Sequence, residues 1–317
     1  MIKQIEGGVC AAQGFTANGV HCGIRKNKTK RDLALIYSDS VCTAAAVYTK
    51  NLVKGAPLAV TKANIKDGKA QAVICNSGNA NTCNANGVEI AEQTCQLLAK
   101  ELKINANDIV VASTGVIGQP LDITPIANGI PSLVAGLGNY SDYACEGIMT
   151  TDIKKKEIAF EFTVGGKVCR IGGIAKGSGM IHPNMATMLV FVTTDCNISS
   201  AMLQKALSED VENSFNMISV DGDTSTNDMV SVLANGKAGN KEITEENADF
   251  KAFQDALSAT TTYLWRGIAA EACKAAADTH FTKNAQTPIL SELRCAAKKH
   301  LPAHGTLSLR RLKILLN

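Results

Sequence analysis

Aromatic side chains make up only 4% of this 317-residue sequence. Proteins that bind single-stranded nucleic acid use aromatic rings as stacking platforms, so we expect no nucleic-acid partner. The net charge of +3 gives no sign of a polyanionic partner either. No two of the eleven cysteines are spaced as Cys-x-x-Cys, which disfavours a structural zinc site. We therefore predict a protein that binds no metal or other cofactor.

Long apolar runs are missing as well. No stretch approaches the roughly eighteen apolar residues of a membrane-spanning helix, and the start of the chain, MIKQIEGGVCAAQG, lacks the apolar core of a secretion signal. We expect no membrane association, and the free thiols fit the reducing cytoplasm. With 45% hydrophobic residues, the chain can bury a sizeable core in one large or two medium domains.

The central feature of the sequence is the segment 176–195, KGSGMIHPNMATMLVFVTTD, in which a glycine-rich turn and a proline precede an apolar run. Thr187 stands where this run begins, and its ordinary interpretation is a strand residue. If the bond between Ala186 and Thr187 were cut, the new α-amine, with a pKa of roughly 7.7–8.0, could act as general base for the threonine's own hydroxyl. The same hydroxyl could make the cut by attacking the Ala186 carbonyl, helped by a strained turn.

Two further features allow a structural or a functional interpretation. Residues 108–122, DIVVASTGVIGQPLD, predict a strand that ends in a turn at Thr114 and Gly115. Such a turn is ordinary, but it can also present backbone N–H groups to an oxyanion. Lys176 lies among glycines that cannot cover it and could reach a ligand carboxylate. The residue order Lys-Gly-Ser at 176–178 does not fit a phosphate-binding Walker motif, which requires Gly-Lys followed by Ser or Thr.

Helices are predicted on both sides of these features. Apolar residues at helical spacing predict an amphipathic helix over 88–102. Residues 199–215 predict a second helix, with Ser200 as its N-cap, and residues 246–278 a third. Between the last two lies an acidic loop with Asp221, Asp223 and Asp228. Because it lacks the spacing and the closing glutamate of an EF-hand, we expect no calcium site there.

Six segments carry a more specific signal: GGVCAAQGFTANGVHCGIRKN, NSGNAN, STGVIG, MTTD, KGSGMIHPNMATMLVFVTTD and SVDGDTSTND. In this order they resemble the ornithine acetyltransferase family of arginine biosynthesis, also called bifunctional glutamate N-acetyltransferases. The resemblance covers about residues 5–270. It implies an α/β fold of the family's own type, built around an N-terminal threonine nucleophile. That fold is similar in chemistry to the N-terminal nucleophile hydrolases and distinct from them in topology.

The resemblance also implies roles for individual residues. The chain would cut itself between Ala186 and Thr187 into an α chain, 1–186, and a β chain, 187–317, which associate as two α and two β chains. Thr187 resembles the family's nucleophile, and Thr114 and Gly115 its oxyanion-stabilising pair. The substrate-binding positions correspond to Thr151, Lys176 and Thr187. Glu271 is a stand-in for a glutamate that the family uses in catalysis and in substrate binding.

The activity implied is a two-step acyltransferase reaction. N-acetylornithine acetylates the threonine and ornithine leaves; the amine of glutamate then takes the acetyl group. Members of the bifunctional type also accept acetyl-CoA as donor, and this chain could be of either type. Two other hypotheses stay open, a peptidase or amidase that passes the acyl group to water and a catalytically inactive relative.

The end of the sequence departs from the family pattern. Relatives carry a DGEG-type turn where this chain reads IAAEACKAAADTHF, and they continue for roughly a further hundred residues. Residues 274–317 contain eight Lys and Arg but only two Asp and Glu, together with His280, His300 and His304. This segment could be a basic amphipathic tail. We expect instead that a frameshift has replaced the family's C-terminus.

Overall fold

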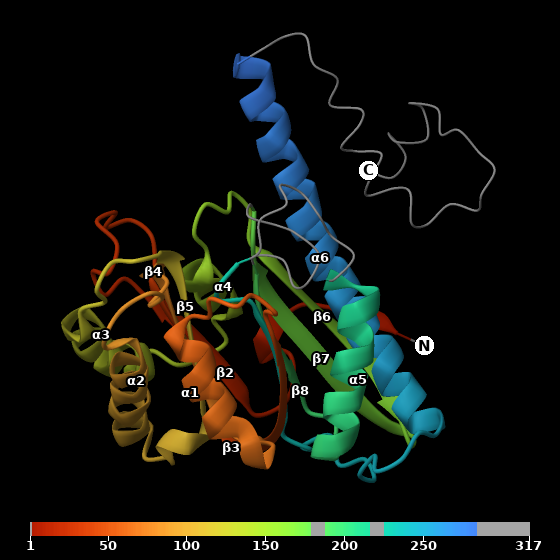
Figure 1. The fold of residues 1–317 in the computed structure, drawn as a ribbon. Coiled ribbons are helices and arrows are strands. Elements are labelled where there is room, and N and C mark those ends of the chain that lie inside the picture. The colour runs from red at the N-terminus through yellow and green to blue at the C-terminus, as the bar shows by residue number, and fades with distance from the viewer. Residues whose placement is uncertain (1, 179–187, 216–224, 284–317) are drawn as a thin grey trace.

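The computed structural model describes residues 2–178, 188–215 and 225–283, with side chains described up to Glu271 (Figure 1). The predicted cleavage site, Ala186 and Thr187, lies outside these residues, as do Asp221 and Asp223. The side chains of the basic segment 274–317, whether an amphipathic tail or a frameshifted end, are not described either. The fold therefore describes the chain up to residue 178 and again from residue 188, on either side of the predicted nucleophile in sequence.

Strands and helices alternate along the described chain. The strands are β1 (Lys3–Ile5), β2 (Phe15–Val20), β3 (Leu33–Tyr48), β4 (Lys69–Asn79), β5 (Ile109–Val116), β6 (Lys156–Val164), β7 (Lys167–Lys176), β8 (Leu189–Thr194) and β9 (Met229–Ala234). The α-helices are α1 (Ala56–Asn64), α2 (Gly87–Leu102), α3 (Ile123–Ala135), α4 (Ser141–Ile148), α5 (Ser200–Asn213) and α6 (Ala248–Lys283), with short 3₁₀ turns at Gly8–Cys10, Ile65–Asp67 and Ala106–Asp108.

The described strands form one mixed sheet in the order β1-β6-β7-β8-β9-β3-β4-β5, with β2 paired to β3. The pairs β4–β5 and β8–β9 are parallel, and the other pairs are antiparallel. The long strand β3 joins the two halves of the sheet, because its first half pairs with β2 and its second half with β9. An irregularity between Tyr37 and Cys42 separates the two halves of β3.

Strands on both sides of the predicted cleavage site share this sheet. β8 and β9 follow residue 187 in sequence, yet they lie between β7 and β3, which precede it. All six residues of β8 and all six of β9 are buried. This fits their near-continuous apolar sequences, since strands covered on both faces lack a polar alternation.

Helices cover both faces of the sheet. Val190 and Val192 point into a core shared with α5 and α6, which lie along β6 to β8 in Figure 1. Leu189 and Phe191 point to the opposite face, into a core that contains Ile148 of α4, because successive strand residues face opposite sides. A third core lies between α2, α3 and strands β3 to β5. The C-terminal part of α6 extends beyond the body of the fold (Figure 1).

The predicted helices are present with one correction. The predicted helix 88–102 is α2, Gly87–Leu102, and the helix predicted over 199–215 is α5, Ser200–Asn213. Its N-cap is Ser199 and not Ser200: Ser199 has an extended backbone, and its side-chain oxygen accepts from the N–H of Met202. Two neighbouring serines offer the same capping chemistry, so the sequence could not distinguish them. No helix in the described ranges is both long and apolar enough to cross a membrane.

Candidate active site

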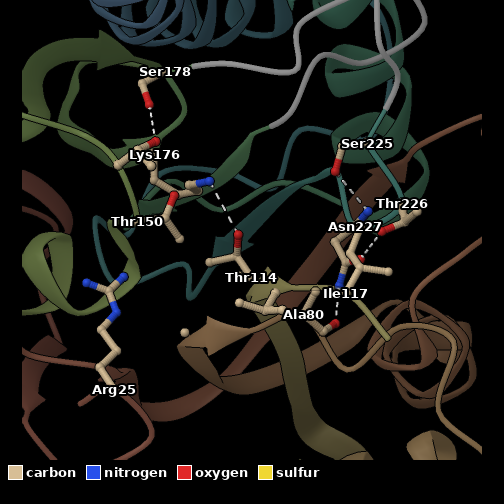
Figure 2. Close-up of a pocket in the computed structure, with 14 residues that line it drawn as sticks. Arg25, Ala80, Thr114, Ile117, Thr150, Lys176, Ser178, Ser225, Thr226 and Asn227 are labelled. Carbon is tan, nitrogen blue, oxygen red and sulfur yellow. Dashed lines mark hydrogen bonds between the residues drawn. The ribbon is translucent and has the colours of Figure 1, made fainter. Parts of the chain in front are cut away.

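A cleft of about 500 Å³ opens where several elements end on one side of the sheet (Figure 2). It collects residues from the ends of β4, β5 and β7, the segment after α4, and the segment before β9. The residues that line it are Arg25, Gly78, Ala80, Thr114, Gly115, Val116, Ile117, Thr150, Thr151, Lys176, Ser178, Ser225, Thr226 and Asn227. Four of the predicted site residues, Thr114, Gly115, Thr151 and Lys176, thus line a single cleft.

Two glycines allow β4 and β5 to meet at the floor of the cleft. Gly78 and Gly115 are paired across the parallel strands, and both have positive φ angles, of 107° and 135°. A Cβ on Gly115 would lie 2.3 Å from the carbonyl carbon of Gly78. No side chain fits at that distance, so position 115 requires glycine both for its backbone angle and for the close approach. The turn predicted at Thr114 and Gly115 is wrong, because β5 continues through both residues to Val116.

Lys176, the last residue of β7, points into the cleft and is almost completely buried. Only 3% of the residue is exposed, and its Nζ donates to Thr114 Oγ1 over 3.3 Å. Burial lowers the pKa of Lys176, and the negative charges of Asp152 and Asp228 oppose that effect. The predicted substrate-binding lysine and the predicted oxyanion threonine are therefore hydrogen-bonded neighbours.

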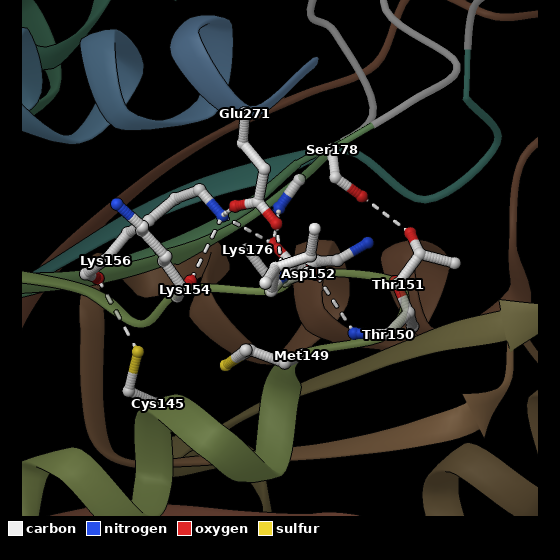
Figure 3. Close-up of polar contacts among 12 residues, drawn as sticks. Cys145, Met149, Thr150, Thr151, Asp152, Lys154, Lys156, Lys176, Ser178 and Glu271 are labelled. Carbon is white, nitrogen blue, oxygen red and sulfur yellow. Dashed lines mark hydrogen bonds and ion pairs between the residues drawn. The ribbon is translucent and has the colours of Figure 1, made fainter. Parts of the chain in front are cut away.

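Asp152 organises the segment that carries Thr150 and Thr151 (Figure 3). Its Oδ1 accepts from the N–H of Gly177 at 2.7 Å and from Lys156 Nζ at 2.8 Å, and its Oδ2 accepts from the N–H of Thr150 at 3.0 Å. Burial alone would raise the pKa of Asp152. The charges of Lys176 and Lys156 and the Gly177 N–H outweigh burial, so the pKa is lowered from its ordinary value. The carboxylate stays ionised and fixes the backbone on both sides of the cleft mouth.

Thr151 contacts the segment that follows β7. Its Oγ1 lies 2.6 Å from Ser178 Oγ, so either hydroxyl can donate to the other. Both residues line the cleft, with Thr150 beside them. These three hydroxyl groups form a polar rim next to Lys176, and the predicted substrate contact of Thr151 stays a prediction that this position allows.

Glu271 lies on the far side of the Asp152 segment from the cleft. From α6 it accepts from Lys156 Nζ and from the N–H of Ile153. Glu271 and Lys156 both line a second cavity, between α6 and the segment 153–156. The ammonium group of Lys156 pairs with both Glu271 and Asp152, so it connects the two carboxylates (Figure 3). In the described fold its contacts are with this charged network, so its predicted direct role in catalysis stays a prediction.

Asn227, which lies in the SVDGDTSTND motif, joins the ends of β4 and β5 to the segment before β9. Its side-chain nitrogen donates to the carbonyls of Ala80 at 2.6 Å and Ser113 at 2.9 Å. Its Oδ1 accepts from the hydroxyls of Thr82 at 2.6 Å and Thr226 at 2.5 Å. With its donors and acceptor all paired, Asn227 holds one wall of the cleft rigid.

Asp228 contacts the residue that directly follows the predicted nucleophile. Its Oδ1 accepts from the N–H of Met188 at 2.9 Å, and its Oδ2 has no hydrogen-bond partner among the described residues. Burial raises the pKa of Asp228 well above its ordinary value, outweighing the Met188 N–H, the Ser225 hydroxyl and the charge of Lys176. Among the described residues, no group of three His, Cys, Asp or Glu side chains could hold a metal ion.

Comparison with known proteins identifies the family. A model of the ArgJ family matches residues 16–285 of the chain. The chain belongs to the ArgJ family. A relative from Symbiobacterium thermophilum, an arginine biosynthesis bifunctional protein ArgJ, is 49% identical over 271 residues, which are 84% of this chain and 67% of that protein. The chain thus spans about two thirds of that ArgJ relative, and the family match continues past residue 270, the predicted limit of the resemblance.

Solved structures agree with the fold predicted for the ArgJ family. Ornithine acetyltransferase from Mycobacterium tuberculosis, complexed with ornithine, is 31% identical with a TM-score of 0.53 and covers 59% of this chain and 100% of that chain. An L-aminopeptidase D-ala-esterase/amidase from Ochrobactrum anthropi, a variant of the Ntn-hydrolase fold, is 12% identical with a TM-score of 0.51 over 82% of this chain and 86% of its own. That second likeness concerns the fold alone. The predicted α/β fold is confirmed. Its predicted difference in topology from the N-terminal nucleophile hydrolases and the place of the nucleophile in it stay predictions.

Sequence reasoning assigned no role to several residues that shape this ArgJ-family site. Arg25, Asp152 and Asn227 all lie within the motifs that identified the family, GVHCGIRKN, MTTD and SVDGDTSTND. The motifs therefore contained the signal. The motifs did not show that these residues lie close together, because only strand order brings residues 25 and 227 to one cleft and residue 152 next to it.

Proposed function

We propose that this chain is a glutamate N-acetyltransferase that takes the acetyl group from N2-acetyl-L-ornithine and gives it to L-glutamate, with Thr187 as the acetyl carrier. The hydrogen bond between Lys176 and Thr114 inside the cleft carries the proposal. A lysine ammonium can only donate, so it occupies an acceptor position on Thr114 Oγ1. The threonine's own hydrogen is then free to point at an oxygen that develops negative charge.

The position of β8 supports Thr187 as the nucleophile. Leu189 pairs with Lys176 across β7 and β8, and residue 187 precedes Leu189 by two positions. The described chain resumes at Met188, and the proposal needs residue 187 to lie within the span of about 7 Å that two residues can cover from Leu189. The hydrogen bond from Met188 to Asp228 anchors the strand at this point. We propose that from there the hydroxyl of residue 187 enters the cleft.

The reaction would proceed in two acyl transfers. The Thr187 hydroxyl attacks the acetyl carbonyl of N-acetylornithine while its α-amine takes the hydroxyl proton. Thr114 and Gly115 stabilise the oxyanion of the tetrahedral intermediate, and the C–N bond breaks as the proton passes to the departing amine of ornithine. Glutamate then enters, its amine attacks the threonine ester, and the acetylated glutamate leaves with the Thr187 hydroxyl restored.

The sheet explains how the proposed α and β chains would stay together after a cut before Thr187. β8 pairs with β7 on one side, and β9 pairs with β3 on the other. Both pairings join the segment before the cut to the segment after it, and each strand is fully buried. Separation would expose this apolar surface to water, which is strongly unfavourable. We further propose the family's assembly of two α and two β chains, acetyl-CoA as a second donor, and a cytoplasmic location.

An acetyl-transfer assay tests the function. Purified protein is incubated with N2-acetyl-L-ornithine with and without L-glutamate, and ornithine and N-acetylglutamate are measured. We expect ornithine in amounts that match the N-acetylglutamate formed when glutamate is present, and no product from a Thr187→Ala variant. Ornithine release that continues without glutamate would identify a hydrolase instead. No release under either condition would identify an inactive relative.

A further inference from the structure

The cleft has an unequal distribution of charge. Among the described residues that line it, Arg25 and Lys176 are charged, both are basic, and no acid is present. The other polar groups are hydroxyls and one amide, such as Thr150, Ser178 and Asn227. A cavity of this kind favours a ligand with a negative charge, and a carboxylate is the anion that an amino acid provides.

The two cations are not equally available to a ligand. Both lie in the field of Asp152, but Lys176 is only 3% exposed and already donates to Thr114. Arg25 is only partly buried, and Figure 2 shows its guanidinium pointing toward Thr150 and apart from the Lys176–Thr114 pair. A guanidinium has five N–H donors in a planar fork that matches a carboxylate. Arg25 therefore offers the better carboxylate site.

Contacts with the protein hold Arg25 in place. Its backbone N–H donates to Asp32 Oδ2 at 2.9 Å, and its Nη2 donates to the carbonyl of Met149, at the end of α4. Its side chain passes over Gly78, where an added Cβ would lie 2.9 Å from Arg25 Cγ. The glycine thus leaves room for the arginine, and the Met149 carbonyl fixes the guanidinium while other donors remain for a ligand.

We infer that Arg25 binds the α-carboxylate of the amino-acid substrate, as a binding residue beside Thr151 and Lys176. The inference rests on the proposed function. N-acetylornithine and glutamate both carry an α-carboxylate next to the nitrogen that holds or receives the acetyl group. One arginine can therefore orient the donor in the first transfer and the acceptor in the second. This places both nitrogens at the same position relative to Thr114.

A comparison of two ligands tests the inference by binding and needs no turnover. Isothermal titration calorimetry on the full chain measures the affinity for L-ornithine, which has no acetyl group to transfer, and for its α-carboxamide, which lacks the negative charge. We expect the wild type to prefer the acid by about tenfold to a hundredfold. Arg25→Gln should lose most of this preference. Arg25→Lys should retain part of it, because the charge remains and the fork is lost.

Arg31→Gln is the matched control. Arg31 lies on the neighbouring segment, donates to Glu146 over 2.6 Å, packs over the ring of Tyr143 and does not line the cleft. This variant should keep the wild-type preference. Each preference is the ratio of the affinities of one variant for the acid and for the amide. A general loss of stability would lower both affinities together and leave this ratio unchanged.

An unchanged preference in Arg25→Gln would overturn the inference, as would a wild type that binds acid and amide equally or binds neither. Should Arg25→Gln fail to fold, Arg25→Lys and the wild-type ligand pair still decide. A preference that depends on Arg25 in a protein without acetyl transfer would retain the carboxylate site and reject the proposed function.

Discussion

Lys156 donates to Asp152 over 2.8 Å although solvent reaches only 3% of the lysine side chain and none of the aspartate's. The same ammonium group contacts Glu271 of α6, and the same carboxylate accepts from the N–H of Gly177. One buried network thus connects the long C-terminal helix to the first residue after β7. It links the packing of α6 to the start of the segment that carries the predicted nucleophile.

Removing the ammonium group of Lys156 should destabilise the fold. Lys156→Met leaves two buried carboxylates without their shared partner, and we expect the free energy of unfolding to fall by about 3–5 kcal/mol. Urea denaturation measures it. Lys155→Met is the matched control, because Lys155 pairs with Asp142 at 3.2 Å on the surface, and its loss should cost about 0–1 kcal/mol. Equal effects of the two substitutions would show that the buried network contributes little.

Gly115 should tolerate no side chain. A Cβ there would lie 2.3 Å from backbone in β4, so Gly115→Ala forces the two strands apart and should impair folding severely. Gly118→Ala is the control: Gly118 also has a positive φ, of 77°, but nothing lies within 4 Å of its Cβ position. It should lose only about 1–2 kcal/mol from its backbone conformation. Thermal unfolding of both variants checks this, and a Gly115→Ala protein as stable as Gly118→Ala would contradict it.

The hydroxyl of Thr114 should contribute to turnover more than to substrate affinity. Thr114→Val removes the proposed oxyanion donor, and we expect kcat for acetyl transfer to fall about 10²–10³-fold with little change in KM. Thr114→Ser keeps the hydroxyl beside Lys176 and should retain most of the activity. Steady-state kinetics with N2-acetyl-L-ornithine and glutamate measure both constants. A wild-type kcat in Thr114→Val would remove Thr114 from the mechanism.

Asp228 should give stability a characteristic pH dependence. Its pKa is raised by burial in the folded state, against about 3.9 when unfolded. As pH rises above about 4, the unfolded chain loses this proton first, so the wild type loses stability until the folded pKa is passed. Asp228→Asn cannot ionise and can still accept from Met188. Its stability relative to the wild type should therefore rise over this range in urea denaturation.

The exposed Asp122 provides a contrast. The N–H of Thr124 lowers the pKa of Asp122, so its titration window lies below the ordinary value. The stability difference between Asp122→Asn and the wild type should not change with pH above about 4. A difference between Asp228→Asn and the wild type that is equally flat would show that Asp228 is ionised in the folded protein.

The sequence predicted individual residues better than it predicted their connections. Thr114, Gly115, Thr151 and Lys176 could be named because each stands in a motif of the family, and all four line the cleft. The network from Lys156 to Asp152 could not be predicted, since the lysine run 154–156 has the composition of an exposed turn. Only the packing of α6 against β6 buries Lys156 and leaves its neighbours Lys154 and Lys155 exposed.

The choice between equivalent residues also needed the structure. Ser199 and Ser200 have the same capping chemistry, and the path of the backbone decides between them. Arg25 is one of several basic residues near the N-terminus, and strand order alone brings it over Gly78 and into the cleft. Apolar periodicity predicts the elements, but it does not determine which strand ends meet.

The intact mass of the purified protein, before and after incubation with N2-acetyl-L-ornithine, tests the central claim most directly. We predict two chains of 186 and 131 residues, the second beginning at Thr187 and gaining the mass of one acetyl group with the donor. Thr187→Ala should remain one chain of 317 residues without an adduct. A wild-type protein that stays uncut, or an acetyl group that appears on the 186-residue chain, would contradict the assignment of Thr187 as the acetyl-carrying nucleophile.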